Sequence, residues 1–371
     1  MPYPPGGASL GAAGHYNATP RKPGGPPVAG GRVTVGAAKS MSILGENALS
    51  ILIWPAMMIA SAVALIAAGV LRPRAVSGPD RVPPGTHVWH LVMVAGFAFF
   101  VWIFTQQAFI YAKLAQAGGT TTAPATLDLS RLSPNDWAFL ATIPALAAAI
   151  ALWAGDRGVG GPELVRGLGL SPRGLPRGIA GGILGAVAIF PPLYLLMVLT
   201  EWVYQRLHIS HPPEHDLLRV MGETKSLTSE LFLILGATVA APLWEEYMFR
   251  GHVQTIIRKV LIRLTTADDP PFARPAGGFP VAAGASTTLI PYAPADVARP
   301  PRVWQTWGAI VIASAIFAMV HPMWMWPPIF FLALGLGYAY ERTGNLWTSM
   351  TIHCLFNGAS TFLYFSGVHG R

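Results

Sequence analysis

Six polar side chains and one aromatic ring lie at helical spacing inside apolar stretches of this chain. They form three motifs: Glu245-Glu246-x-x-x-Arg250, Phe317-x-x-x-His321 and His353-x-x-x-Asn357. Carboxylates, imidazoles and amides are groups with which proteins transfer protons and stabilise developing negative charge. Ionisable residues are costly at membrane depth and usually mark functional sites there. The sequence therefore predicts a reaction site built from three separate helices.

The two neighbouring glutamates are expected to play different parts. Glu246 and Arg250 are four residues apart with the acid on the N-terminal side, the favourable order for an ion pair on one helix face. Glu245 points about 100° away from that face and lacks the cation. We therefore predict that Glu245 is the candidate general base. In the alternative, both acids belong to a salt-bridge network between helices.

The two histidine motifs each have a catalytic and a packing interpretation. Phe317 and His321 share a helix face, so the imidazole could orient water and stabilise the Glu245 carboxylate. His353 and Asn357 also share a face, and two convergent donors are what a developing oxyanion requires. Both motifs could instead form hydrogen bonds between packed helices.

Composition places these motifs in a membrane protein. Of the 371 residues, 52% are hydrophobic and 11% are charged, whereas soluble domains have roughly 25% charged residues. Apolar stretches of about 20 residues can cross a hydrocarbon core of roughly 30 Å as helices. The predicted fold class is an all-α, multi-pass transmembrane helical bundle with about eight spans. We expect the spans at 51–71, 89–114, 136–154, 178–200, 230–252, 304–321, 326–340 and 346–365.

The chain divides into three predicted regions. Residues 1–48 are rich in Gly, Pro and Ala and are expected to form a disordered tail. Residues 49–177 are expected to hold accessory transmembrane helices with few internal polar groups, and 178–366 hold the core with its motifs. Within the core, a long loop rich in Pro, Ala and Gly is predicted at 265–302.

The basic charge points to the lipid bilayer as a partner. The net charge is +8, and the basic residues are scattered over the tail and loops rather than clustered on one soluble face. This distribution argues against nucleic acid and is typical of loops that follow the positive-inside rule and attract anionic lipid. The arginine-rich composition favours the plasma membrane of a bacterium as the location of this multi-pass protein.

A cysteine nucleophile and a metal site are both disfavoured. The single cysteine, Cys354, excludes an intrachain disulfide, and its side chain diverges by about 100° from that of the adjacent His353. Zinc bound by His321, His353 and Glu245 is conceivable, but the His-Glu-x-x-His pattern is missing. In a second, loop-borne cluster, two prolines interrupt the ligand spacing: His208, His211, Glu214, His215 and Asp216. No cofactor and no metal are predicted.

In this order, the three motifs resemble those of the CPBP family of multi-pass membrane proteins (CAAX protease and bacteriocin-processing, also called the abortive-infection family). Further matches are Pro242 before the acids, Gly251-x-x-Gln254 after the arginine and the run Arg342–Trp347. The resemblance covers about 178–365. The first three spans and the 265–302 loop depart from the compact family pattern.

The resemblance implies an intramembrane endopeptidase that depends on glutamate and uses neither a metal nor a covalent intermediate. By that resemblance, Glu245 and His321 would activate water. Glu246 and Arg250 would shape the site. His353 and Asn357 would hold the oxyanion. The implied partner is a membrane-associated or lipid-linked peptide or protein.

Two classes of non-peptidase remain open. Some members of the family act in bacteriocin self-immunity, so a non-enzymatic membrane scaffold or immunity protein is one alternative. A proton-coupled transporter is the other, because buried Glu and His residues also build proton relays. Cleavage of a membrane peptide by water would distinguish the peptidase from both.

Overall fold

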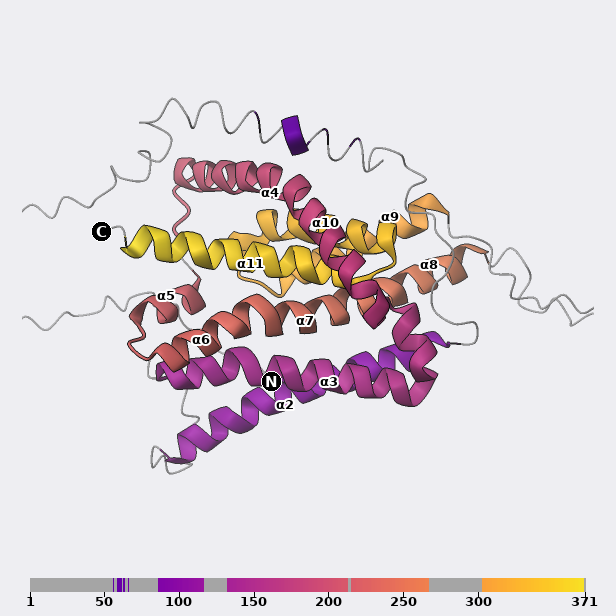
Figure 1. The fold of residues 1–371 in the computed structure, drawn as a ribbon, viewed down its shortest axis with the longest axis horizontal. Coiled ribbons are helices and arrows are strands. Elements are labelled where there is room, and N and C mark those ends of the chain that lie inside the picture. Colours follow the sequence, from indigo (N-terminus) through magenta and orange to yellow (C-terminus); the bar gives the residue numbers. More distant parts are fainter. Residues whose placement is uncertain are drawn as a thin grey trace, which may run out of the picture. The chain divides into compact units, whose positions relative to one another are not determined.

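The computed structural model describes residues 86–116, 132–212, 215–266 and 302–369, with isolated positions between 56 and 66. Every regular element among these residues is a helix (Figure 1), so the predicted all-α fold class is confirmed. The predicted tail, most of the first predicted span and nearly all of the predicted long loop lie outside the described residues.

The elements follow one another in an order that matches seven of the predicted spans. They are α2 (Val88–Gln116), α3 (Pro134–Gly167), the short 3-10 helix η3 (Pro172–Gly174), α4 (Leu175–Arg206), α5 (Asp216–Glu223), α6 (Leu227–Leu235), η4 (Gly236–Ala240), α7 (Ala241–Glu246), η5 (Tyr247–Gln254), α8 (Thr255–Thr266), α9 (Val303–Met319), η6 (Met323–Met325), α10 (Trp326–Thr343) and α11 (Leu346–His369). From α6 to α8 the helix is continuous, and we call this stretch the central rod.

Membrane-spanning length is clear for only part of this set. Three stretches of the described chain are long and apolar enough to cross a membrane: Val88–Gln116, Pro134–Arg206, which includes the turn between α3 and α4, and Leu227–Thr265. Val303–Met319 is a shorter apolar helix. The count of about eight spans therefore stays a prediction.

Large apolar side chains on the outside of the bundle fit a lipid environment. On α2, Trp89, Met93, Phe97, Phe100 and Phe104 are all exposed. Soluble monomers rarely leave such a continuous apolar stripe uncovered. The chain is a membrane protein on these grounds and on its composition.

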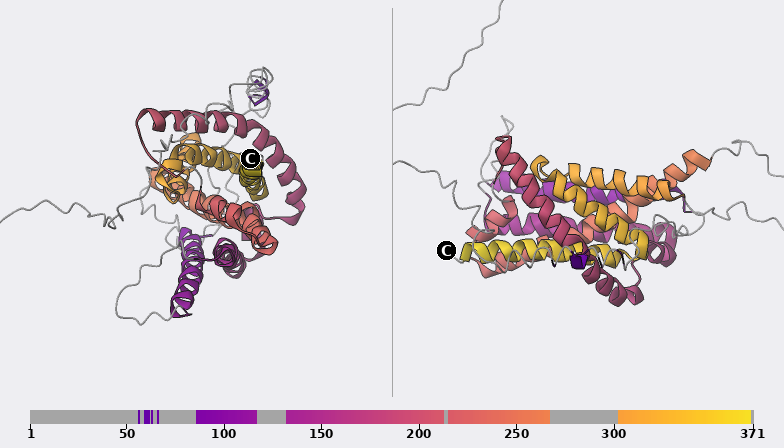
Figure 2. Two further views of the ribbon diagram at one scale, coloured as in Figure 1. Left: turned by 90° about the vertical axis from the view of Figure 1, so that its left-hand side faces the viewer. Right: turned by 90° about the horizontal axis from the view of Figure 1, so that it is seen from above.

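The rod lies in the middle of the packing. On one side it contacts α11, which in turn packs against α4 (Figure 1). On the other side it contacts α2 and α3. Figure 2 shows α4 arching over α10 and α11. Helices α4 and α11 approach closely at Gly185, where an added Cβ would lie only 2.6 Å from Cδ1 of Ile352. This agrees with the close approach that small residues permit in membrane helices.

A backbone carbonyl that loses its helical donor to a proline is hydrogen-bonded by a side chain instead. Pro191 lies inside α4 and has no N–H, so the carbonyl of Val187, four residues earlier, loses its helical donor. Ser61 Oγ donates a hydrogen bond of 2.9 Å to this Val187 oxygen. Membrane helices tolerate internal prolines when such side chains satisfy the backbone again.

The rod contains two π-helical segments, η4 and η5, and the glutamate pair lies on the single α-helical stretch α7 between them. A π-helical turn bonds residue i to i+5, and such turns often occur at functional sites. It also leaves carbonyls unpaired. Thr142 of α3 donates from Oγ1 to the Phe232 oxygen at 3.0 Å, just before η4. A side chain of α3 thus satisfies a backbone carbonyl of α6, next to the first π-helical segment.

At one end of the bundle, the α3–α4 turn meets the α10–α11 turn. Asn345 Nδ2 donates to the Gly174 oxygen at 2.7 Å, and Trp347 Nε1 donates to the Ser171 oxygen at 3.2 Å. Gly344 ends α10 in the left-handed conformation with φ 63°. Part of the run matched to the family, Arg342–Trp347, therefore locks two turns together.

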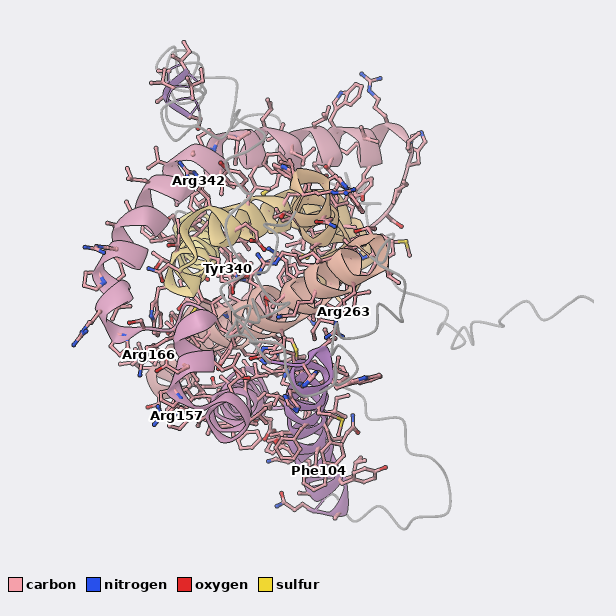
Figure 3. The ribbon with its side chains drawn as sticks, turned by 90° about the vertical axis from the view of Figure 1, so that its right-hand side faces the viewer. Phe104, Arg157, Arg166, Arg263, Tyr340 and Arg342 are labelled. Carbon is pink, nitrogen blue, oxygen red and sulfur yellow. The ribbon has the colours of Figure 1, made fainter. Side chains whose placement is uncertain are left out.

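The same end of the bundle carries a set of exposed arginines. These arginines lie in the C-terminal part of α3, in the last turns of α8 and α10, and at the start of α4 and α9. Figure 3 shows four of these arginines at this end: Arg157, Arg166, Arg263 and Arg342. We call it the basic end.

Candidate active site

The central rod, α9 and α11 bring the three motifs together. Glu245 and Glu246 end α7, and Arg250 follows in η5. Phe317 lies in α9, which packs against η5, and His353 lies in α11, which packs against α7. The three motifs therefore come from three separate helical segments, as the sequence predicted, except that His321 lies just beyond the end of α9.

The Glu246 carboxylate is fully buried and has partners on both the rod and α11. Arg250 Nε donates to Glu246 Oε2 at 3.2 Å, and both side chains are completely buried. This is the ion pair expected from their four-residue spacing. The other oxygen, Oε1, lies 3.1 Å from Nδ1 of His353. Glu246 therefore joins the rod to α11 by a hydrogen bond as well as by packing.

Glu245 is set apart from this pair. Its side chain is 23% exposed, and its recorded contact is at 3.7 Å, from Oε2 to Nε2 of His353. It makes no ion pair with Arg250 among the described residues. The divergence expected for adjacent helical positions therefore leaves one glutamate committed and the other accessible.

Phe317 is the apolar centre of the site. Its ring is fully buried and lies 4.8 Å from the His321 ring and 5.8 Å from the His353 ring, centroid to centroid. The guanidinium carbon of Arg250 lies 5.2 Å from the Phe317 centroid, a cation–π distance. Nη1 and Nη2 of Arg250 have no hydrogen-bond partner in the described part of the chain. The ring thus packs against the cation and both imidazoles.

His321 lies beyond its helix rather than in it. The predicted span reached His321, but α9 ends at Met319 because the chain turns before Pro322, which cannot continue a helix. His321 Nδ1 lies 2.8 Å from the Phe317 carbonyl oxygen. A carbonyl only accepts, so Nδ1 carries the hydrogen and Nε2 of the neutral ring keeps a lone pair. No hydrogen bond joins His321 to Glu245 within the described residues.

The two expected oxyanion donors have different partners. His353 contacts the glutamates, whereas Asn357 Nδ2 donates to the Ala237 backbone oxygen at 2.8 Å. Asn357 therefore forms a contact between α11 and η4. One of its two amide hydrogens remains without a partner among the described residues. The oxyanion role of His353 and Asn357 stays a prediction.

A second buried polar cluster was not anticipated from the sequence. Asp156 Oδ2 accepts from Tyr247 Oη at 2.6 Å, and Asp156 Oδ1 lies 3.1 Å from His252 Nε2. Asp156 is fully buried because α3 extends to Gly167, past the predicted end at Ala154; Gly161 kinks the helix instead of ending it. The accessory region therefore carries an internal acid. The signal available was Asp156 itself, two residues beyond an apolar run.

A third buried cluster joins the rod to α10. Glu341 accepts from Gln254 Nε2 at 3.0 Å and pairs with Arg258 Nη1 at 3.0 Å. Gln254 was noted as a family match, and its place here is the junction of η5 with α10. These contacts join η5 and α8 to α10.

Two of the loop histidines, His211 and His215, have other partners in the described part of the chain. His211 pairs with Glu201 at 3.0 Å and stacks on Trp324, and His215 caps α5 through Nδ1 and the Leu217 N–H. No group of three or more His, Cys, Asp or Glu residues suited to a metal occurs in the described ranges. The side chains of Glu214 and Asp216 lie outside them.

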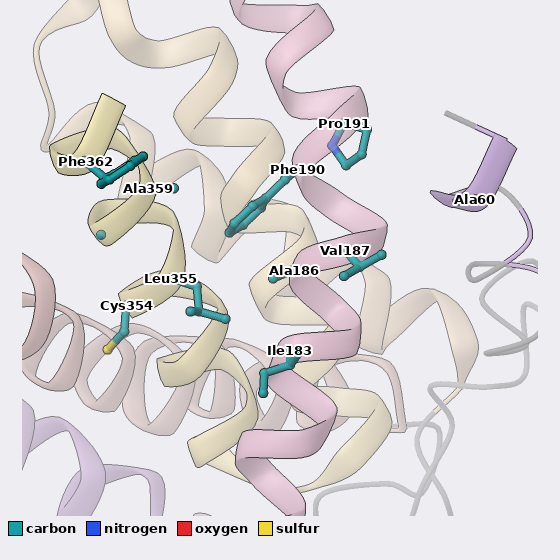
Figure 4. A pocket seen from close by; sticks show the side chains of 11 residues that line it. Ala60, Ile183, Ala186, Val187, Phe190, Pro191, Cys354, Leu355, Ala359 and Phe362 are labelled. Atoms are coloured by element: carbon teal, nitrogen blue, oxygen red, sulfur yellow. The ribbon is translucent and has the colours of Figure 1, made fainter. Parts of the chain in front are cut away.

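An apolar groove of about 540 Å³ lies between α4 and α11, away from the acids (Figure 4). Ile183, Val187 and Phe190 line one wall, and Cys354 and Leu355 line the other. None of the six candidate site residues borders it. Cys354 thus faces this groove, as expected from its divergence from His353.

Part of the chain is similar to a known protein family. Residues 227–359 match the family model described as type II CAAX prenyl endopeptidase Rce1-like. No curated protein and no solved structure matches the chain. The matched segment begins with the rod and includes all three motifs. The match supports a CAAX-type protease at the level of the family. Over this segment the chain is similar to the Rce1-like family of CAAX endopeptidases, which agrees with the family that the motifs predicted.

Proposed function

We propose that this protein is a glutamate-dependent, metal-independent intramembrane endopeptidase with Glu245 as its general base. The observation behind the proposal is that the two neighbouring glutamates differ in burial and in partners. Glu246 is held by Arg250 and His353, whereas Glu245 is partly exposed and, among the described residues, has only the longer contact of 3.7 Å with His353. A carboxylate without a committed partner can accept a proton from water as it attacks a carbonyl.

His321 would act on the same water. Its Nδ1 is occupied by the Phe317 carbonyl, so the lone pair on Nε2 is available to orient a water molecule. No hydrogen bond joins Glu245 to His321 in the described part of the chain, and a bridging water would let the two groups act together. Glu246 and Arg250 would shape the site around them.

His353 and Asn357 would stabilise the oxyanion of the tetrahedral intermediate. The Glu246 carboxylate can only accept, so His353 Nδ1 carries a hydrogen and a donor at Nε2 requires the doubly protonated ring. Glu245 and Glu246 are the two carboxylates that can balance that charge. Asn357 would contribute the amide hydrogen that Ala237 does not use.

The substrate would be a peptide held at the membrane by a lipid. The family description names prenylated CAAX sequences, and the apolar surface of the helices suits a lipid-linked peptide. The proposed location is the plasma membrane of a bacterium, with the chain crossing it several times. The competing proposal is a non-enzymatic immunity or scaffold protein that keeps the polar cluster for packing.

The test is cleavage by the full chain in lipid vesicles. Farnesylated CAAX-type peptides and a panel of membrane peptides would be incubated with the protein and with the Glu245→Gln variant, and products would be identified by mass spectrometry. Glu245→Gln should lower turnover by roughly 10²-fold or more, with melting temperature unchanged. Activity should survive exhaustive chelation. Equal cleavage by a well-folded Glu245→Gln protein would exclude Glu245 as the base, and loss on chelation with rescue by zinc would indicate a metallopeptidase.

A further inference from the structure

The carbonyl of Ala237 is left without a backbone donor by the sequence around it. In η4 the backbone bonds run from i to i+5, and the Ala241 N–H bonds the Gly236 oxygen. The next bond in this register would come from residue 242 to Ala237. That residue is Pro242, which has no N–H. An unpaired carbonyl at membrane depth requires another donor.

Asn357 supplies that donor. Its Nδ2 lies 2.8 Å from the Ala237 oxygen, and this is the single hydrogen bond of its side-chain amide among the described residues. The bond therefore decides how the amide plane is oriented. Because the amide has two hydrogens, fixing one of them also fixes the direction of the other.

We propose that Pro242 is a positioning residue that orients the Asn357 amide through the Ala237 carbonyl. Pro242 lies three residues before Glu245 on the same rod, so the residue that opens the acceptor and the proposed base belong to one short segment. The Ala237 carbonyl therefore has a fixed position along the rod relative to Glu245 and Glu246. The consequence for catalysis rests on the proposed function, whereas the coupling between Pro242 and Asn357 does not.

The coupling can be measured without any assay of activity. Asn357→Ala should lower the melting temperature in the parent protein, because it strands the Ala237 carbonyl. In a Pro242→Ala background the new N–H can bond that carbonyl, so Asn357→Ala should lower the melting temperature much less. Pro242→Ala alone should leave the melting temperature equal or higher, because an internal proline weakens a helix. Equal losses in both backgrounds would overturn the proposal.

Kinetics then separate positioning from a merely structural role. Pro242→Ala should lower kcat by up to roughly 10²-fold with little change in KM, as expected when a catalytic group is misplaced. In an Asn357→Ala background the same proline substitution should have little further effect. If the loss persists there, Pro242 acts through the glutamates and the proposal is wrong. If the melting temperatures show that Pro242 and Asn357 are coupled but Pro242→Ala leaves kcat unchanged, the proposal is also wrong.

A matched control is available in α4. Pro191→Ala also removes a helix-interior proline whose freed carbonyl is bound by a side chain, but it lies on a helix that carries none of the site residues. Pro191→Ala should leave kcat unchanged. A parent protein that cleaves no peptide would refute the proposed function, while the thermal cycle would still decide whether Pro242 and Asn357 are coupled.

Discussion

The imidazole of His353 reaches both glutamates of the pair, with Nδ1 at 3.1 Å from Glu246 and Nε2 at 3.7 Å from Glu245. Because one ring contacts both acids, it couples the buried, committed carboxylate to the accessible one. Glu246 fixes the orientation of the ring by accepting at Nδ1, in the way that a carboxylate orients a histidine in other hydrolase sites. The first three predictions below follow from this arrangement and from the buried clusters around it, and the fourth follows from the charges at the two ends of the bundle.

Loss of the Arg250 cation should destabilise the protein. Arg250→Ala leaves the Glu246 charge fully buried beside Phe317 without its ion-pair partner. We expect the free energy of unfolding to fall by about 3–5 kcal/mol. Thermal unfolding in detergent would measure this, with Arg263→Ala as the control, because Arg263 is exposed in the last turn of α8 and should cost less than about 0.5 kcal/mol. Equal melting temperatures for the two variants would contradict the burial of the pair.

Loss of the Asp156 carboxylate should destabilise the protein with no direct effect on chemistry. His252 Nδ1 faces the Tyr247 carbonyl at 3.2 Å and its Nε2 faces Asp156, so a proton lies between His252 and Asp156. Asp156→Asn breaks this pairing in a fully buried place, and about 3–5 kcal/mol should be lost. Tyr247→Phe removes one hydrogen bond to the carboxylate and should cost about 1.5–3 kcal/mol.

Comparing the kcat of Tyr247→Phe with that of Glu245→Gln tests whether the Asp156 cluster takes part in the reaction. After correction for the folded fraction, the kcat of Tyr247→Phe should match that of the parent protein. A fall in kcat of the folded protein as large as that of Glu245→Gln would place the Asp156 cluster in the reaction itself.

Removal of the Asn357 amide should affect the transition state more than substrate binding. An oxyanion donor acts chiefly in the transition state, so Asn357→Ala should lower kcat by about 10²–10³-fold with little change in KM. Steady-state kinetics on a cleaved peptide would measure both constants. If Asn357→Ala lowers the melting temperature but leaves kcat per folded molecule intact, Asn357 is a packing residue and the scaffold interpretation gains support.

The charge asymmetry between the ends of the bundle predicts the membrane orientation. Exposed arginines gather at the basic end: Arg157, Arg166, Arg173, Arg177, Arg263, Arg302 and Arg342. Glu163 is the single exposed acid at this end among the described residues. At the opposite end, the described side chains balance: Lys113, Arg206, Arg219 and Lys225 against Asp136, Glu201, Glu223 and Glu230. The positive-inside rule therefore places the basic end in the cytoplasm.

Single-cysteine labelling can test this orientation, because Cys354 is the only cysteine of the chain. In a Cys354→Ser background, Arg173→Cys and Lys225→Cys would be treated with a membrane-impermeant maleimide on intact bacterial spheroplasts. Lys225→Cys should react at once, and Arg173→Cys only after permeabilisation. The reverse pattern would invert the assignment.

Helix spacing alone was sufficient for the local part of the site. The ion pair between Glu246 and Arg250 depends only on positions within one rod, so four-residue spacing predicted it correctly. The same holds for the divergence of Glu245 from Glu246 and for the contact between Phe317 and His321. The all-α class followed from composition, because a spanning segment must satisfy its backbone hydrogen bonds internally.

Contacts between helices could not be read from the sequence, because they depend on which faces meet. Only the packing of α11 against the rod decided that His353 contacts both glutamates and that Asn357 donates to Ala237. The burial of Asp156 depended on the continuation of α3 to its kink at Gly161. Periodicity within a segment is determined by its own residues, whereas the partner of a buried polar group is determined by whichever unsatisfied atom the tertiary structure places within hydrogen-bonding distance.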